Sequence, residues 1–107
     1  MVDVSVRKRK DAAWRVREML TVPNWAIMEL LADGKPKTVR QIYSALGKQF
    51  TRKTLILSLR TLIIKINVLE PQHVMTQRGY EIGYVLSKPA FECMESMRKL
   101  NQQIEKK

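Results

Sequence analysis

Apolar residues over 11–66 recur three and four positions apart, which predicts a series of amphipathic helices. Residues 1–10 do not show this pattern and are expected to form a mobile basic arm. We expect one helix over 11–20 and a second over about 25–32, with the residues 22–24 as an interruption between them.

The next stretch predicts two consecutive helices joined by a tight link. Thr38 and Gln41 have the spacing of a capping box, in which two side chains bond the free amides at a helix start. A short helix follows and ends at Gly47. Thr51 can cap a longer helix over 51–66. We expect its buried face to consist of Leu55, Leu59, Leu62, Ile63 and Ile66.

The pattern becomes strand-like after Asn67, a residue type that suits the left-handed position at a helix end. Strands are expected over 68–72 or slightly beyond and over 81–86, joined by a turn at 77–80, so that they form a β-hairpin. A final amphipathic helix over 88–105 follows. The predicted fold class is mainly α with a β-hairpin wing (α+β).

This order of elements resembles the winged helix-turn-helix superfamily of DNA-binding proteins. The matching runs are Thr38-x-x-Gln41-Ile42, Thr54-Leu55-x-x-x-Leu59-x-x-Leu62 and Tyr84-x-Leu86-Ser87. In that order, they match the positioning helix, the recognition helix and the exit from the wing. The last of the three runs is similar to the Tyr-x-Leu-Thr of MarR-, PadR- and ArsR-type regulators. A weaker likeness to OmpR-type effector domains rests on Thr76-Gln77-Arg78-Gly79 and Gly83-Tyr84, with extra residues between the glycines.

The resemblance implies a winged helix-turn-helix with an extra N-terminal helix and a long C-terminal helix. The expected organisation is a flexible basic arm at 1–10, the winged domain at 11–87 and a C-terminal, dimerising helix at 88–107.

The charge of the chain points to a polyanionic partner. Lys and Arg number 20 against 10 Asp and Glu, which gives a formal net charge of +10. Charge alone does not separate DNA from RNA, an anionic membrane or an acidic protein. However, residues 34–66 hold eight basic side chains and no acidic one. Together with the resemblance, this favours double-stranded DNA, with the helix over 51–66 in the major groove.

Candidate DNA contacts fall into four sets, and a solvated or solubilising role stays open for the charged residues. We expect base edges to meet Lys53, Thr54, Leu57, Ser58 and Thr61, with a thymine methyl group against Leu57. Phosphates are expected to meet Lys35, Lys37, Arg40, Lys48, Arg52 and Arg60. The wing residue Arg78 is expected at the minor groove. The arm residues expected to follow a groove or the backbone are Arg7, Lys8, Arg9 and Lys10.

Two apolar sets have alternative interpretations. Leu57 and Ile64 either contact DNA or a partner protein on the outward side of their helix, or that helix ends earlier and Ile64 returns to the core. We favour the core position for Ile64.

The final helix is expected to pair with a second chain, and the alternative is packing on the helix over 11–20. The expected dimer interface consists of Ala90, Phe91, Met94, Met97, Leu100 and Ile104.

The sequence lacks the residues that catalysis or metal binding needs. Cys93 and His73 are the only residues of their types, so one chain can form neither a disulfide framework nor a zinc site. No paired carboxylates, catalytic triad or Gly-rich phosphate loop is found, so we expect no enzyme, no cofactor and no small-molecule ligand. Because no signal peptide or bilayer-spanning run is found, we expect a cytoplasmic, nucleoid-associated protein.

The leading functional hypothesis is a homodimeric transcriptional regulator that binds double-stranded DNA. Two alternatives stay open. One is a DNA-coating protein of plasmid or virus type for partition, replication or packaging. The other is a winged-helix interaction module that docks on the transcription machinery through Leu57, Ile64 and the final helix.

Overall fold

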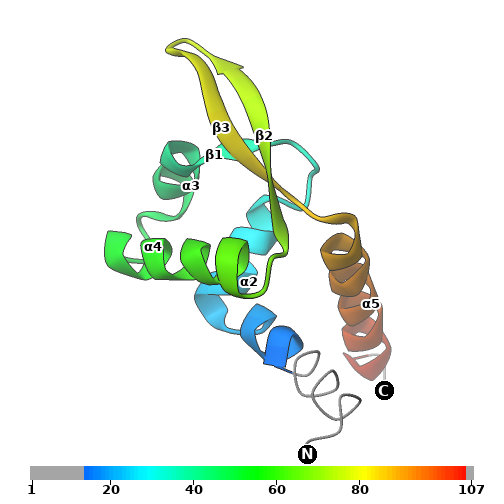
Figure 1. Ribbon diagram of the computed structural model, residues 1–107. Coiled ribbons are helices and arrows are strands. Elements are labelled where there is room, and N and C mark those ends of the chain that lie inside the picture. Colours follow the sequence, from blue (N-terminus) through cyan, green and yellow to red (C-terminus); the bar gives the residue numbers. More distant parts are fainter. Residues whose placement is uncertain (1–13, 106–107) are drawn as a thin grey trace, which may run out of the picture.

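The structure is a computed structural model, and it describes residues 14–105 (Figure 1). Residues 14–19 are helical. The elements that follow are α2 (Val22–Leu30), β1 (Lys37–Thr38), α3 (Val39–Leu46), α4 (Arg52–Arg60), the π-helical turn η1 (Thr61–Lys65), β2 (Leu69–Thr76), β3 (Gly79–Leu86) and α5 (Lys88–Glu105). The chain is mainly helical, with a three-stranded antiparallel sheet and a long C-terminal helix, which confirms the predicted fold class. This order of elements is compatible with a winged helix.

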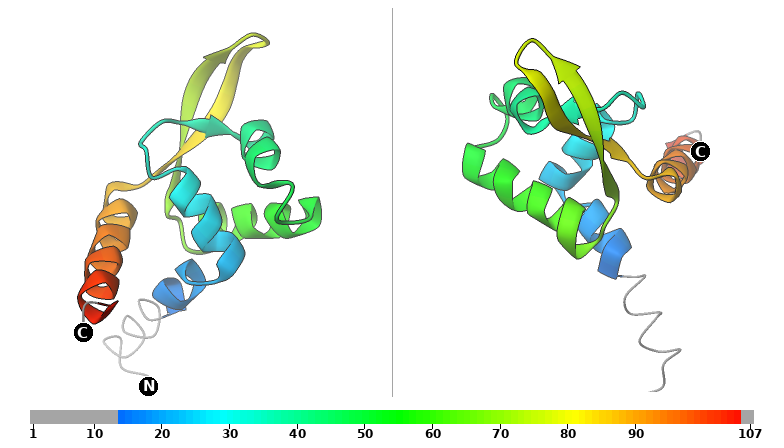
Figure 2. Two further views of the ribbon diagram at one scale, coloured as in Figure 1. Left: turned by 180° about the vertical axis from the view of Figure 1, so that it is seen from behind. Right: turned by 45° about the horizontal axis from the view of Figure 1, so that its top comes forward.

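Three parts of the molecule lie apart in space. α3 and α4 lie on one side, α5 lies on the opposite side, and the hairpin of β2 and β3, which we call the wing, projects beyond the helices (Figure 1). The further views keep this arrangement, with α5 remote from α3 in each (Figure 2). α3, α4 and the wing therefore share one part of the surface, while α5 has a surface of its own.

A single hydrophobic core joins these parts. Its members are Met19, Ile27, Met28, Leu31, Ile42, Leu46, Leu55, Leu59, Leu62, Ile66, Val68, Leu69, Ala90 and Met94. The predicted buried face of the helix over 51–66 is confirmed, except that Ile63 is half-buried against the core. The predicted periodicity therefore orients α4 correctly, with its opposite face toward solvent.

α2 begins earlier than the sequence pattern predicts. Pro23 lies in its first turn, where the amide that proline lacks would have no helical partner. Asn24 is buried, and its Nδ2 donates to the Glu18 carbonyl at 2.8 Å. The expected interruption at 22–24 is therefore wrong, and the break between the two helices lies at Leu20 and Thr21.

The predicted helix starts are confirmed by their hydrogen bonds. The Thr38 hydroxyl accepts from the Gln41 amide at 3.2 Å, and the Gln41 side chain accepts from the Thr38 amide at 2.9 Å, which completes the capping box. The Thr51 hydroxyl accepts from the Thr54 amide at 3.2 Å at the start of α4. After η1, Asn67 has the expected left-handed backbone, with φ of 54°.

The sheet contains a strand that the sequence pattern did not reveal. β1 pairs antiparallel with β3 through Lys37 opposite Tyr84 and Thr38 opposite Gly83, so the strand order is β1-β3-β2. A Cβ atom on Gly83 would lie 2.7 Å from a Val74 methyl carbon and 3.3 Å from the Lys37 backbone. Glycine at this position therefore permits β1 to approach β3.

The wing is longer, and its turn tighter, than expected. β2 pairs with β3 from Leu69 opposite Leu86 to Thr76 opposite Gly79, so only Gln77 and Arg78 form the turn. Gly79 has a φ of 100°, a left-handed value that favours glycine after such a turn. The Thr76 hydroxyl accepts from the Arg78 amide at 3.1 Å and lies 3.1 Å from the Gly79 carbonyl oxygen. Arg78 is thereby held at the very tip of the wing.

Candidate nucleic-acid interface

The link between α3 and α4 is tight, as a helix-turn-helix requires. The amides of Gln49 and Phe50 both donate to the Leu46 carbonyl, at 3.0 and 3.1 Å. A Cβ atom on Gly47 would lie 2.6 Å from the Tyr43 carbonyl oxygen, so a larger residue would force the turn to shift. Phe50 packs against the core. These contacts fix the start of α4 relative to α3.

The outward face of α4, formed by Lys53, Leu57 and Arg60, is exposed to solvent. Leu57 lies at its centre and is 51% exposed. No residue of α4 or η1 is acidic, and the helix presents its positively polarised end together with Arg52 and Lys53. This face combines positive charge with exposed apolar side chains, Leu57 at 51% and its neighbour Ile56 at 40%.

Ile64 does not return to the core. It is 71% exposed in η1, so the position that we favoured for it is wrong. The reason is that the chain stays helical beyond α4: the Ile66 amide donates to the Thr61 carbonyl at 2.9 Å. This π-type turn keeps Leu62 and Ile66 buried while Ile64 stays on the outer side.

The hydroxyl groups predicted to meet bases are either buried or have a partner in their own helix or its cap. Ser58 is only 7% exposed and lies on the buried side of α4. The Thr61 hydroxyl donates to the Leu57 carbonyl at 3.0 Å, and the Thr54 hydroxyl accepts from the Thr51 hydroxyl at 2.9 Å. Of the predicted base-contacting set, Lys53 and Leu57 are therefore the side chains that project freely.

Two of the predicted phosphate-binding residues are bound to acids. Lys37 forms an ion pair with Asp33, and Lys37 Nζ lies 2.9 Å from Asp33 Oδ2. This bond, followed by the bond from the Lys35 amide, lowers the pKa of the Asp33 carboxyl below its ordinary value. Arg40 donates to Glu81 of the wing at 2.8 Å, and Glu81 also accepts from the Thr76 hydroxyl. Glu81 thus ties the wing to α3 and partly neutralises Arg40.

A concave surface runs from the start of α4 across α3 to the tip of the wing. An open hollow of about 660 Å³ lies between α3 and the wing and is lined by Arg40, Gln41, Ser44, Val74, Met75, Thr76, Gln77 and Arg78. A second hollow of about 470 Å³ shares Arg40 and Ser44 with it and reaches Arg52. The Arg52 guanidinium lies 5.3 Å from the centre of the Tyr43 ring, which holds it on the α3 side. Three of the predicted arginines therefore line one continuous surface.

The remaining predicted residues are spread more widely. Lys35 and Lys48 are exposed in the loops on either side of α3. The arm residues 7–10 lie outside the described part of the chain.

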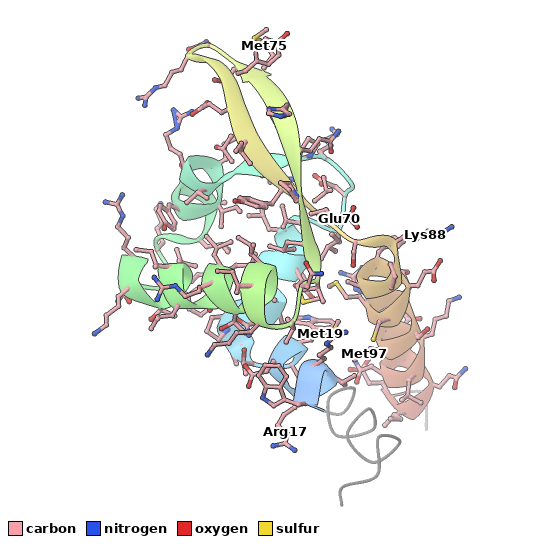
Figure 3. The ribbon with its side chains drawn as sticks, in the orientation of Figure 1. Arg17, Met19, Glu70, Met75, Lys88 and Met97 are labelled. Atoms are coloured by element: carbon pink, nitrogen blue, oxygen red, sulfur yellow. The ribbon has the colours of Figure 1, made fainter. Side chains whose placement is uncertain are left out.

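The structure adds two features that the sequence analysis did not name. One is Glu81, which binds Arg40, and the other is an exposed apolar set on the wing, Met75, Tyr80 and Ile82. Figure 3 shows Met75 at the far end of the wing. Alternation along the strands was the signal for the apolar set, whereas only the fold reveals the partner of Glu81.

α5 is divided between two environments. Ala90 and Met94 are buried in the same core as Met19, so they pack on their own domain and are not free for a second chain. Leu100 and Ile104, in the second half of α5, are 59% and 62% exposed. Met97 is half-buried, and Phe91 is exposed. The first half of α5 thus packs on the core of its own domain, and the second half keeps an open apolar side.

Within residues 14–105, no group of three His, Cys, Asp or Glu side chains could hold a metal ion. None of the helices in the same range is long and apolar enough to cross a bilayer. Comparisons with family models, curated proteins and solved structures found no match. The site itself is the only basis for a function.

Proposed function

We propose that this protein is a homodimeric transcriptional regulator that binds double-stranded DNA through α4. The observation that carries the proposal is the outward face of α4, on a helix that follows a tight turn from α3 and precedes a hairpin. The major groove admits an α-helix, and helix-turn-helix proteins present their second helix to it. Lys53 and Arg60 supply the charge that attracts a polyanion.

The concave surface between α4, α3 and the wing supports the same proposal. Arg40, Arg52 and Arg78 line it, together with hydroxyl and amide groups. Guanidinium, hydroxyl and amide groups are the usual donors to DNA phosphates. In this proposal Arg78 meets the minor groove next to the major groove that α4 enters, as the resemblance to MarR-, PadR- and ArsR-type regulators implies.

The second half of α5 supports a homodimer. Leu100 and Ile104 are exposed on a helix that lies remote from α3, so pairing through them leaves both copies of α4 free. Two copies of α4 would then meet half-sites about 34 Å apart, one helical turn of DNA.

Docking on a protein is the second candidate. Met75, Tyr80 and Ile82 are exposed on one face of the wing, where Met75 lies opposite Tyr80 and His73 lies opposite Ile82. Such a patch is common at protein interfaces.

A paired substitution tests the DNA proposal. Lys53→Ala combined with Arg60→Ala should abolish binding to a mixed-sequence duplex at physiological salt, measured by fluorescence anisotropy, because it removes two phosphate-neutralising charges. The matched control is Lys88→Ala combined with Lys99→Ala, which removes the same charge from α5 and should preserve binding. Equal affinity of both variants would reject the proposal.

Footprinting then separates the two DNA-binding roles. A regulator protects a discrete site, whereas the protection given by a coating protein spreads with concentration.

A further inference from the structure

The helix proposed to enter the major groove offers few hydrogen-bonding groups for reading bases. α4 and η1 contain no Asn, Gln, Asp or Glu, the residue types that recognise adenine and cytosine by hydrogen bonds. The Thr61 hydroxyl donates to the Leu57 carbonyl, the Thr54 hydroxyl accepts from the N-cap Thr51, and Ser58 is on the buried side. Among base edges this leaves guanine, to which Lys53 or Arg60 can donate, and the methyl group of thymine.

Leu57 is the most exposed apolar side chain of α4, at 51%, and the neighbouring Ile56 is less exposed, at 40%. Leu57 lies between two cations, with Lys53 about one turn before it and Arg60 about one turn after it. The only apolar group on the major-groove edge of a base pair is the C5-methyl group of thymine. A branched apolar side chain in this position is complementary to that methyl group and to no other base edge.

We infer that the thymine C5-methyl group is the main base feature that α4 reads, and that Leu57 reads it. The inference rests on the proposed function. Lys53 and Arg60 supply positive charge that attracts the phosphates whatever the sequence, and either can also donate to guanine, while Leu57 selects T·A pairs. Uracil pairs with adenine as thymine does but lacks the methyl group, so it isolates this contact.

The test uses the full-length chain and a duplex selected from a random-sequence pool, resynthesised with uracil in place of single thymines. At the positions that face Leu57, we expect binding to weaken about two- to fourfold for each methyl group removed, the effect of burying one methyl-sized group. Leu57→Ala should bind the thymine and uracil duplexes equally. Ile64→Ala is the matched control, because it truncates another exposed apolar side chain farther along the helix and should keep the thymine preference.

The outcomes are distinct. Equal affinity of the parent protein for thymine and uracil duplexes at every position, with duplex binding intact, overturns this inference and leaves the proposed function standing. A thymine preference that persists in Leu57→Ala also overturns it, because another residue would then read the methyl group. Absence of binding to any duplex rejects the proposed function and this inference together. Circular dichroism verifies that both variants are folded.

Discussion

Helix α4 and the segment that leads into α3 carry the same kind of charge in different surroundings. Beside α3, Lys37 is bound to Asp33 and Arg40 is bound to Glu81. On α4, Lys53 and Arg60 form no ion pair with any residue of the range 14–105. A cation with a carboxylate partner is partly neutralised and attracts a phosphate less strongly, whereas an unpaired cation exchanges only water and small ions.

The comparison shows that an acid-free stretch of sequence need not be uniformly basic in space. Asp33 lies immediately before the stretch 34–66, and Glu81 reaches Arg40 from a position 41 residues later in the chain. Both acids act beside α3. Near α3 these acids offset the charge of Lys37 and Arg40, whereas Lys53 and Arg60 of α4 keep theirs. If the proposed function is right, we therefore expect the cations of α4 to contribute more to binding than these two.

Among single substitutions of the basic residues, Arg60→Ala should have the largest effect. Loss of one unpaired phosphate contact should weaken duplex binding and lower the slope of log K against log salt by about one. Equilibrium titrations at several salt concentrations measure both quantities. Lys99→Ala, which removes one charge from α5, should leave the slope unchanged. An Arg60→Ala slope equal to that of the parent would place Arg60 outside the interface.

Glu81→Gln should have a smaller effect of opposite sign. Glutamine keeps an acceptor for Arg40 and Thr76 but removes the charge that neutralises Arg40, so duplex affinity should rise about two- to threefold and the salt slope should steepen. The same titrations apply. Adding Arg40→Ala should remove the gain, because the gain depends on the freed guanidinium. If affinity still rises in the double variant, Glu81 acts by general repulsion of DNA and not through Arg40.

Elements defined by neighbouring residues could be predicted from the sequence. The capping box at Thr38, the cap at Thr51 and the left-handed Asn67 depend on contacts over a few residues, and each is confirmed. β1 could not be predicted, because two residues become a strand only when Gly83 lets them approach β3. The predicted interruption at 22–24 was wrong because a proline can either interrupt a helix or occupy its first turn, and Pro23 does the latter.

The candidate site was predictable as a list of residue types but not as an arrangement. Helical periodicity placed Lys53, Leu57 and Arg60 outward, as the structure has them. It could not show that Arg40 is bound to an acid of the wing, because that contact joins residues far apart in the chain. It placed Ile64 outward as well, and the core position that we favoured was wrong because the helix continues through the π-type turn after α4.

Lys37→Ala should have a weaker effect than Lys35→Ala, although the two lysines are close neighbours. Lys37 is bound to Asp33, whereas Lys35 forms no ion pair within residues 14–105. Each substitution removes one positive charge, so a difference in the salt slope reports the pairing and not the total charge. If the two variants lose duplex affinity equally, the ion pair with Asp33 does not reduce the contribution of Lys37 to binding. The paired cations beside α3 and the unpaired cations of α4 would then differ less than we propose.

Asp33→Asn should give the smallest effect. The Lys37 ammonium, and then the Lys35 amide, hold the pKa of the Asp33 carboxyl below its ordinary value of 3.8. Because the folded pKa is the lower one, the carboxylate stabilises the fold above 3.8 and loses this contribution as the pH falls through the folded value. The carboxylate is exposed to solvent, so only a slight loss of stability is expected near neutral pH, vanishing in acid. Urea denaturation across pH measures this loss of stability. A loss that persists unchanged in acid would exclude the ionised carboxylate as its source.

The same substitution also frees Lys37 from its ion pair. Lys37→Ala should therefore reduce the salt slope of duplex binding more in the Asp33→Asn background than in the parent.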